Sequence, residues 1–343
     1  MRTEAEHRRS GPGVRPRPRA VLVATVVAAT IALMAGCGTS SSSPGASGKA
    51  QPDRAGLVDL GNGRSIHMEC RGSGGPTVVL VAGMGERADN FMITSADRTS
   101  EDGSVFPAVA GFTRVCAYDR PGTTTATDAG FELSRSTPVE SPATVGDSAE
   151  DLDRLLRASG EPGPYVLVGH SLGGPIVRLY AAAHPDDVAG IVLDDALSEN
   201  LADGLTPAQV ESLQALNDPV TQGRPPGSEQ DFFATAVVPL LSAAAAAPDV
   251  PTIILTADQW LLTAEVVESG RAAGILPEFV TVEFADALWA SQLAAQDVLA
   301  SKFPGAEHVT QTDAAHYIHL DNPQLVIDSI RDVVDQVRAS TPG

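Results

Sequence analysis

Residues 165–174 read YVLVGHSLGG. The first four residues are apolar and rich in valine, which is typical of a strand buried on both faces of a parallel sheet. The next five match the pattern G-x-S-x-G, and residues 176–183 have the composition of a helix. A serine between a strand and a helix is typical of a nucleophile elbow, in which a sharp turn exposes the hydroxyl beside a helix N-terminus. Ser171 is therefore the candidate nucleophile.

The small residues around Ser171 have a physical reason. Side chains at Gly169 and Gly173 would collide across so tight a turn, and the turn forces Ser171 into a strained backbone conformation. Pro175 falls in the first turn of the predicted helix, where a missing N–H does no harm. The alternative is a purely structural Gly-Ser turn, but the strand and the helix on either side favour the nucleophile.

Strand and helix patterns alternate on both sides of this turn. Short apolar runs predict strands at 64–70, 77–82, 114–118, 165–168, 189–193, 252–256 and 308–311. Apolar residues at helical spacing predict helices at 147–159, 176–183 and 323–337. This alternation predicts an α/β fold with a mostly parallel sheet, helices on both faces and ligands at the carboxyl ends of the strands. Residues 198–248, called the cap segment below, interrupt the alternation and are predicted to cover the site as an insertion after the sixth strand.

Composition limits the classes of protein that this chain can be. Hydrophobic residues make up 43% of the 343 residues and charged residues 19%, which is ordinary for a globular protein. Acidic residues outnumber basic ones by 43 to 23, so the formal net charge is −20. Such a surface repels phosphate backbones, and we expect no nucleic-acid partner.

The N-terminal residues indicate export. Six arginines among the first nineteen residues precede an uncharged, largely apolar stretch at 20–36, the pattern of a secretory signal. The sequence LMAGC (33–37) resembles a bacterial lipobox, so we expect a signal peptide at 1–36 and lipidation of Cys37. The alternative is an uncleaved signal anchor, and both place the rest of the chain outside the cytoplasmic membrane. The Ser/Gly-rich residues 37–54 are predicted to be a tether, and residues 55–343 the catalytic domain.

Four segments carry a resemblance to a known family. They are TVVLVAGMG (77–85), YDRPG (118–122), GHSLG (169–173) and HYIHLDNP (316–323). In this order they resemble the α/β-hydrolases, and the resemblance covers residues 55 to 340. It implies a serine hydrolase whose triad runs serine, acid, histidine along the chain. Asp119 and Arg120 are expected to brace their loop.

The resemblance assigns the base and leaves two choices for the acid. A serine hydroxyl needs a base, and His316, on a loop after the last predicted strand, fits the family's position; His319 is its competitor. The acid usually follows the seventh strand, where Asp258 lies two positions early. A minority of the family place it after the sixth strand, where Asp195 lies. We favour Asp195 and keep Asp258 as the alternative.

The resemblance also implies two donors for the oxyanion of a tetrahedral intermediate. The backbone N–H of Leu172 is one, and the N–H of Met84 is the other. Ala82 stands where the family usually has a histidine, so that supporting side chain is missing here. Since no cluster of cysteine, histidine and carboxylate has metal-ligand spacing, we expect neither a metal nor a cofactor.

If the protein is exported, the remaining cysteines, Cys70 and Cys116, can form a disulfide. A compartment outside the cytoplasmic membrane permits disulfides. By the family's sheet order, the strands that hold the two cysteines lie side by side, which implies a Cys70–Cys116 disulfide. The alternative is two buried free thiols.

The function expected from these residues is hydrolysis of small-molecule carboxylic esters through an acyl-enzyme, by an exported protein anchored to the membrane at Cys37. An acyltransferase or an amidase or peptidase would use the same triad. A non-catalytic binding protein on a hydrolase scaffold is the alternative from a different class. Neither the identity of the substrate nor the oligomeric state follows from the sequence.

Overall fold

A computed structural model describes residues 52–127, 130–139, 144–218, 221–229, 241–242 and 246–340. The predicted signal peptide, Cys37 and nearly all of the predicted tether lie outside these residues, as do parts of the cap segment. In the described ranges, none of the helices combines the length and the apolar character that crossing a membrane requires.

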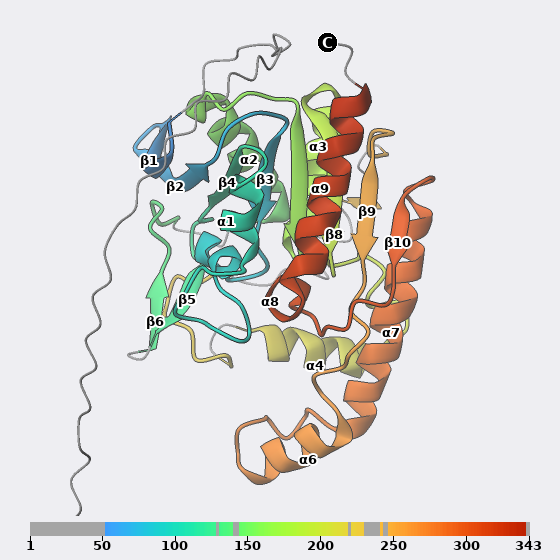
Figure 1. The fold of residues 1–343 in the computed structure, drawn as a ribbon. Coiled ribbons are helices and arrows are strands. Elements are labelled where there is room, and N and C mark those ends of the chain that lie inside the picture. The colour runs from blue at the N-terminus through green and yellow to red at the C-terminus, as the bar shows by residue number, and fades with distance from the viewer. Residues whose placement is uncertain are drawn as a thin grey trace, which may run out of the picture. The chain divides into compact units, whose positions relative to one another are not determined.

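An eight-stranded sheet forms the centre of the fold (Figure 1). In spatial order its strands are β1 (Arg54–Gly61), β2 (Arg64–Arg71), β4 (Val115–Tyr118), β3 (Thr77–Val81), β7 (Tyr165–His170), β8 (Val188–Asp194), β9 (Thr252–Leu255) and β10 (Glu307–Val309). The β1–β2 and β2–β4 pairs are antiparallel, and every other neighbouring pair is parallel. This confirms the predicted α/β architecture.

The burial of each strand follows from its sequence. Every residue of β3 and β7 is buried, as expected for continuous apolar runs at the centre of a parallel sheet. All seven predicted strands are present, with ends shifted by a few residues. The eighth, β1, was not predicted, because only Val58 of its residues is buried and its apolar pattern is weak. It begins at Arg54, so the last residue of the predicted tether belongs to the sheet.

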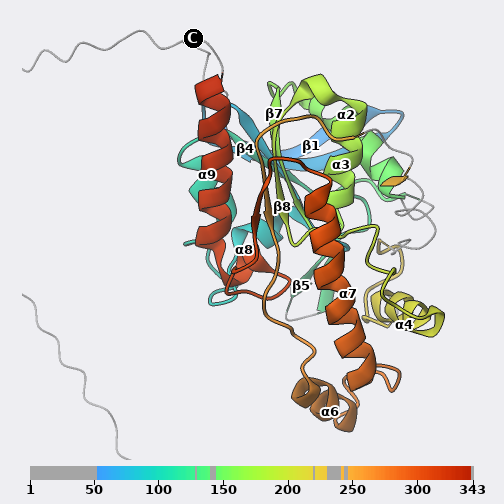
Figure 2. The ribbon, with the colours of Figure 1, turned by 90° about the vertical axis from the view of Figure 1, so that its right-hand side faces the viewer.

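Helices cover both faces of the sheet (Figure 2). On one face lie α9 (Pro323–Ser340) and α1 (Val105–Ala110), and on the other lie α2 (Val145–Ser159), α3 (Gly173–Ala183) and α7 (Val282–Ser301). Two separate apolar clusters fill the spaces between the sheet and these layers. The smaller elements are η1 (Ala88–Met92), η2 (Pro185–Asp187), α8 (Ile318–Asp321) and a two-stranded sheet of β5 (Thr124–Thr127) and β6 (Gly130–Leu133).

Two segments, rather than one, cover the end of the sheet at which β9 terminates (Figure 1). The cap segment contributes α4 (Pro207–Asn217). The second cover is α6 (Ala264–Ala272) with the start of α7, and it follows β9. The sequence predicted only the first of these, because the break in strand and helix alternation ends at residue 248.

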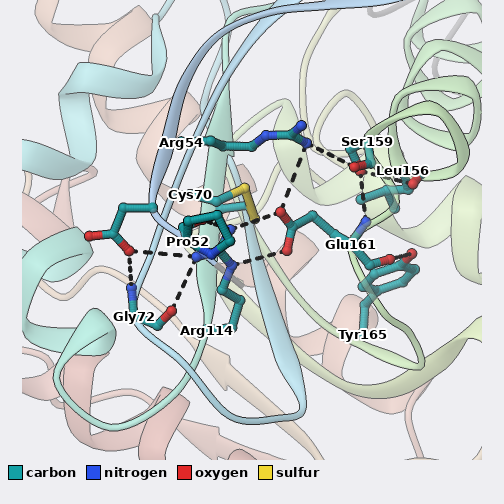
Figure 3. The surroundings of a disulfide bond; sticks show 11 residues. Pro52, Arg54, Cys70, Gly72, Arg114, Leu156, Ser159, Glu161 and Tyr165 are labelled. Carbon is teal, nitrogen blue, oxygen red and sulfur yellow. Dashed lines mark hydrogen bonds and ion pairs between the residues drawn. A yellow bond between two sulfur atoms is a disulfide. The ribbon is translucent and has the colours of Figure 1, made fainter. Parts of the chain in front are cut away.

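The expected disulfide is present. Cys70 on β2 and Cys116 on β4 are register partners whose Cα atoms lie 4.1 Å apart, and their sulfurs are bonded. Beside this bond, Arg114 donates to both carboxylate oxygens of Glu161, at 2.9 and 3.0 Å (Figure 3). It also donates to the carbonyl of Pro52, so the first described residue is held against the edge of the sheet.

Candidate active site

The turn at Ser171 has the strained geometry that its sequence predicts. Ser171 has φ of +48°, in the left-handed region that most residues avoid. A Cβ at position 169 would lie 2.7 Å from the carbonyl oxygen of Gly173, and a Cβ at 173 would overlap the carbonyl of Val81. Only glycine at both positions therefore lets β7 and α3 meet at so sharp an angle.

Ser171 lines a cavity of about 230 Å³, called the Ser171 cavity below. Leu172, Met84, Asp195 and His316 line it too, so the candidate residues taken from distant parts of the sequence converge on one site. Its outer wall comes from the cap segment and from residues 257–292.

His316 and Asp195 form a close pair in this cavity. The Nδ1 of His316 lies 2.6 Å from Oδ2 of Asp195, a distance typical of a charge-assisted hydrogen bond. Asp195 is 2% exposed, and its other oxygen accepts a hydrogen bond from the N–H of Ala257 at 3.0 Å. Since Nδ1 donates to the carboxylate, Nε2 is left as the proton acceptor. Within the described residues no hydrogen bond joins the Ser171 hydroxyl to His316; such bonds commonly tighten when substrate binds.

The N–H groups of the β3 loop (residues 82–86) differ in whether a described residue accepts a hydrogen bond from them. The N–H of Gly83 donates to Oε2 of Glu86 at 3.1 Å, and the N–H of Gly85 donates to Oε2 of Glu229 at 2.7 Å. Between them, the N–H of Met84 donates to none of the described residues, and the same holds for the N–H of Leu172. Met84 and Leu172 both line the Ser171 cavity.

Arg120 binds the carbonyl groups at the start of the same loop. Its guanidinium donates to the carbonyls of Ala82 and Gly83 at 2.7 and 2.6 Å. It also forms a two-bond pair with Glu229 of the cap segment, each bond 2.8 Å long, and the side chains of this pair are each 2% exposed. Burial alone would lower the pKa of Arg120, but the Glu229 carboxylate outweighs it and raises that pKa. Arg120 therefore braces the β3 loop rather than only the loop in which it lies.

Residues 76–267 match a family described as the alpha/beta hydrolase fold, and this match spans more than half of the chain. The protein belongs to the α/β-hydrolase fold family. It is 34% identical over 148 residues to an uncharacterized protein of Schizosaccharomyces pombe, and 45% identical over 58 residues to Lipase LipV of Mycobacterium tuberculosis. These matches cover 38% and 17% of this chain but only 26% and 22% of the relatives' own lengths.

Solved structures of the same fold align over most of this α/β-hydrolase. A structure described as Est816, an N-acyl homoserine lactone degrading enzyme, aligns with a TM-score of 0.54 at 17% identity. The epoxide hydrolase CorEH aligns with a TM-score of 0.52, also at 17% identity. The alignments cover 81% and 82% of this chain and 100% and 98% of those chains, and at this identity they show a shared fold.

The two competing candidates occupy other places in this α/β-hydrolase. Asp258 accepts hydrogen bonds from the N–H of Ala314 and the hydroxyl of Thr312, so its partners lie on the loop before His316. His319 is completely buried, with Nδ1 2.6 Å from Oδ2 of Asp194. The structure therefore pairs His316 with Asp195 and gives each competitor a different partner.

His170, which is completely buried, forms an ion pair with Glu86 on the wall of the Ser171 cavity. Its Nδ1 lies 3.2 Å from Oε2 of Glu86, and its Nε2 lies 3.1 Å from the carbonyl oxygen of His316. Both partners are acceptors, so both ring nitrogens donate and the imidazole is protonated. Burial alone would lower the pKa of His170, but the Glu86 charge outweighs it and raises this pKa to about 9. Burial would likewise raise the pKa of Glu86, and the charge of His170 instead lowers it to about 2.

This ion pair is expected to make the free energy of unfolding decrease as the pH becomes alkaline. Because the pKa of His170 is about 9 in the folded protein and 6.5 is its ordinary value, the stabilisation is complete below pH 6.5 and is lost as pH rises through 9. The free energy of unfolding is expected to fall by up to about 3 kcal/mol over this range. Urea titrations of the wild type, of His170→Gln and of His308→Gln as a matched control test this. Only His170→Gln should lose the decrease in the free energy of unfolding between pH 6.5 and 9. A wild-type free energy that does not change with pH over this range would contradict the ion pair.

His170, Asp194 and His319 also lie close enough together to be considered as metal ligands, with potential ligand atoms within 4.8 Å of one another. Both nitrogens of His170 already have partners, however. His319 likewise uses Nδ1 toward Asp194, and its Nε2 lies 3.2 Å from the side-chain nitrogen of Asn90. The described contacts therefore engage all four ring nitrogens of the two histidines in hydrogen bonds.

Sequence reasoning missed several residues of this site. Glu86 and Arg224 line the Ser171 cavity, and Glu229 holds the β3 loop. Glu86 follows the recognised segment 77–85 directly, so its position was the one available signal. The other two lie in the cap segment, whose irregular pattern gives no indication of which residues reach the cavity.

Proposed function

We propose that this protein is a serine hydrolase that cleaves carboxylic esters of small molecules. Ser171 is the nucleophile, His316 the base and Asp195 the acid of the triad. The observation that carries the proposal is the 2.6 Å contact between His316 Nδ1 and Asp195 Oδ2, on the wall of the cavity that Ser171 lines. The similarity to a named lipase over 58 residues supports an ester as the substrate.

The reaction proceeds in two stages. As Ser171 Oγ attacks the ester carbonyl carbon, Nε2 of His316 takes the hydroxyl proton. The oxyanion accepts hydrogen bonds from the N–H groups of Met84 and Leu172. The imidazolium then returns its proton to the departing alkoxide, which leaves as an alcohol and leaves an acyl-serine behind. Water repeats both steps and releases the carboxylic acid.

A fluorophosphonate probe tests the nucleophile directly. The probe is expected to label the wild-type protein and the control variant Ser212→Ala, whose half-buried serine on α4 donates to the carbonyl of Ala208. Ser171→Ala should lose both the label and the hydrolysis of p-nitrophenyl esters. If the folded wild type stays unlabelled, a non-catalytic binding protein is favoured. If added alcohol is converted to a new ester in place of acid release, the reaction is acyl transfer.

We further propose that the enzyme is exported and held at the membrane surface by a lipid on Cys37. This rests on the arginine-rich N-terminus, the apolar residues 20–36 and the resemblance of LMAGC to a lipobox. Labelled palmitate should be incorporated by the wild type and not by Cys37→Ala. A wild-type protein without label would exclude the lipid anchor.

A further inference from the structure

One arginine on the wall of the Ser171 cavity has no counter-ion among the described residues. Arg224 belongs to the cap segment and lines the cavity together with Ser171 and His316. Its Nε and Nη1 atoms are buried, and none of the described residues accepts a hydrogen bond from them. Arg224 as a whole is half-buried, but buried guanidinium N–H groups without acceptors are destabilising, so these two atoms need an explanation.

The carboxylates near Arg224 are already paired. Glu86, on the cavity wall, binds protonated His170, and Asp195 binds His316. Glu229, five residues after Arg224, is the partner of Arg120. Each of these three negative charges thus has its own partner.

The position of Arg224 connects it with the reacting centre. A Cβ built on Gly85 would overlap Nη1 of Arg224, so the guanidinium lies directly against the β3 loop. Gly85 has φ of +67°, and it is followed along the loop by Glu86, another residue of the cavity wall. The cation therefore lies close to the Met84 N–H, where the carbonyl of an ester would bind.

A second side chain of the cavity wall also has a donor without an acceptor in the described part of the chain. The indole nitrogen of Trp260 is buried without a partner among the described residues. Its ring stacks on that of Trp289 with the centroids 5.0 Å apart, and the two form an apolar surface beside the donors. Leu213 and Leu288 extend this surface. The wall thus combines an apolar part with donors that lack acceptors.

We propose that the substrate is an ester that also carries a carboxylate, which Arg224 binds; this rests on the ester hydrolysis proposed above. A guanidinium presents parallel N–H groups that match the two oxygens of a carboxylate. The apolar wall formed by Trp260 and Trp289 accommodates the hydrocarbon part of the same molecule.

The test compares two pairs of substrates, and the two members of each pair differ mainly in charge. They are the p-nitrophenyl half-esters of adipic and suberic acid and the corresponding esters with a terminal amide in place of the carboxylate. For the full-length protein in detergent, kcat/KM is expected to be at least about tenfold higher for the carboxylate member of each pair. In Arg224→Gln this ratio should fall to about one, and Arg224→Lys should retain part of it. Arg157→Gln, an exposed arginine on α2, is the matched control and should keep the wild-type ratio.

A second readout separates this proposal from the proposed function. Binding of suberate to Ser171→Ala is measured by calorimetry, with the diamide of suberic acid as the neutral reference. Suberate should bind more tightly than the diamide, and adding Arg224→Gln should weaken suberate binding by about tenfold or more. This result would support the carboxylate site even if no ester were cleaved. An unchanged substrate ratio or an unchanged suberate affinity in Arg224→Gln would overturn the proposal.

Discussion

Asp195→Asn is expected to lower kcat for p-nitrophenyl esters by about 10⁴-fold. The Asp195 carboxylate accepts a hydrogen bond from Nδ1 of His316. In the proposed triad this leaves Nε2 to take the proton of Ser171. An asparagine can present its N–H₂ group to Nδ1 instead, and the proton then moves to Nε2. The imidazole is thereby held in the tautomer that cannot act as a base.

Asp258→Asn is the matched control for this prediction. It removes a carboxylate on the neighbouring loop that accepts hydrogen bonds from Ala314 and Thr312. We expect a loss in kcat of no more than about tenfold, since the base keeps its partner. Thermal unfolding of both variants establishes that they are folded at the assay temperature. The opposite order of the two effects would assign the acid to Asp258.

Glu229→Gln is expected to lower kcat by about 10²-fold while changing KM much less. The side chain keeps its size but loses the charge that balances Arg120, and it no longer offers two equivalent oxygens to Arg120 and Gly85. The β3 loop then loses the contacts that position the Met84 N–H. In the proposed mechanism this donor acts mainly on the oxyanion of the transition state, so the loss is expected in kcat.

Glu199→Gln controls for the general cost of breaking a buried ion pair. Glu199 forms a two-bond pair with Arg178 at 2.7 and 2.9 Å, and both residues are buried. It does not line the Ser171 cavity. We expect Glu199→Gln to lower the unfolding temperature without a comparable change in kcat. Equal effects of the two variants on kcat would show that Glu229 contributes only to stability.

The parts of this site that the sequence predicts are those governed by local chemistry. The sharp turn needs glycine on both sides of Ser171, and a strand buried on both faces needs an apolar run. Each of these requirements produces a pattern that is visible within ten residues of the sequence. The fold follows from the same kind of signal repeated along the chain. The strand β1 escaped prediction because it lies at the sheet edge, where most of its side chains are exposed.

The remaining parts depend on contacts between distant segments. Asp195 and Asp258 both follow strands of the sheet, and only the three-dimensional placement of His316 distinguishes them. Glu229 and Arg224 are five residues apart in an irregular segment, yet one is paired with Arg120 and the other faces the cavity. No periodic pattern encodes such a difference, because it arises from where the chain folds back onto the β3 loop.

The bond between Glu229 and Arg120 has a consequence for how this enzyme could be re-engineered. Chimeras that exchange residues 198–248 for the corresponding piece of a relative would change the shape of the pocket. They would also remove the counter-ion of a guanidinium that is buried at the base of the loop. The exchanged segment therefore has to supply a glutamate that pairs with Arg120. A new specificity and the proposed oxyanion site must then be designed together.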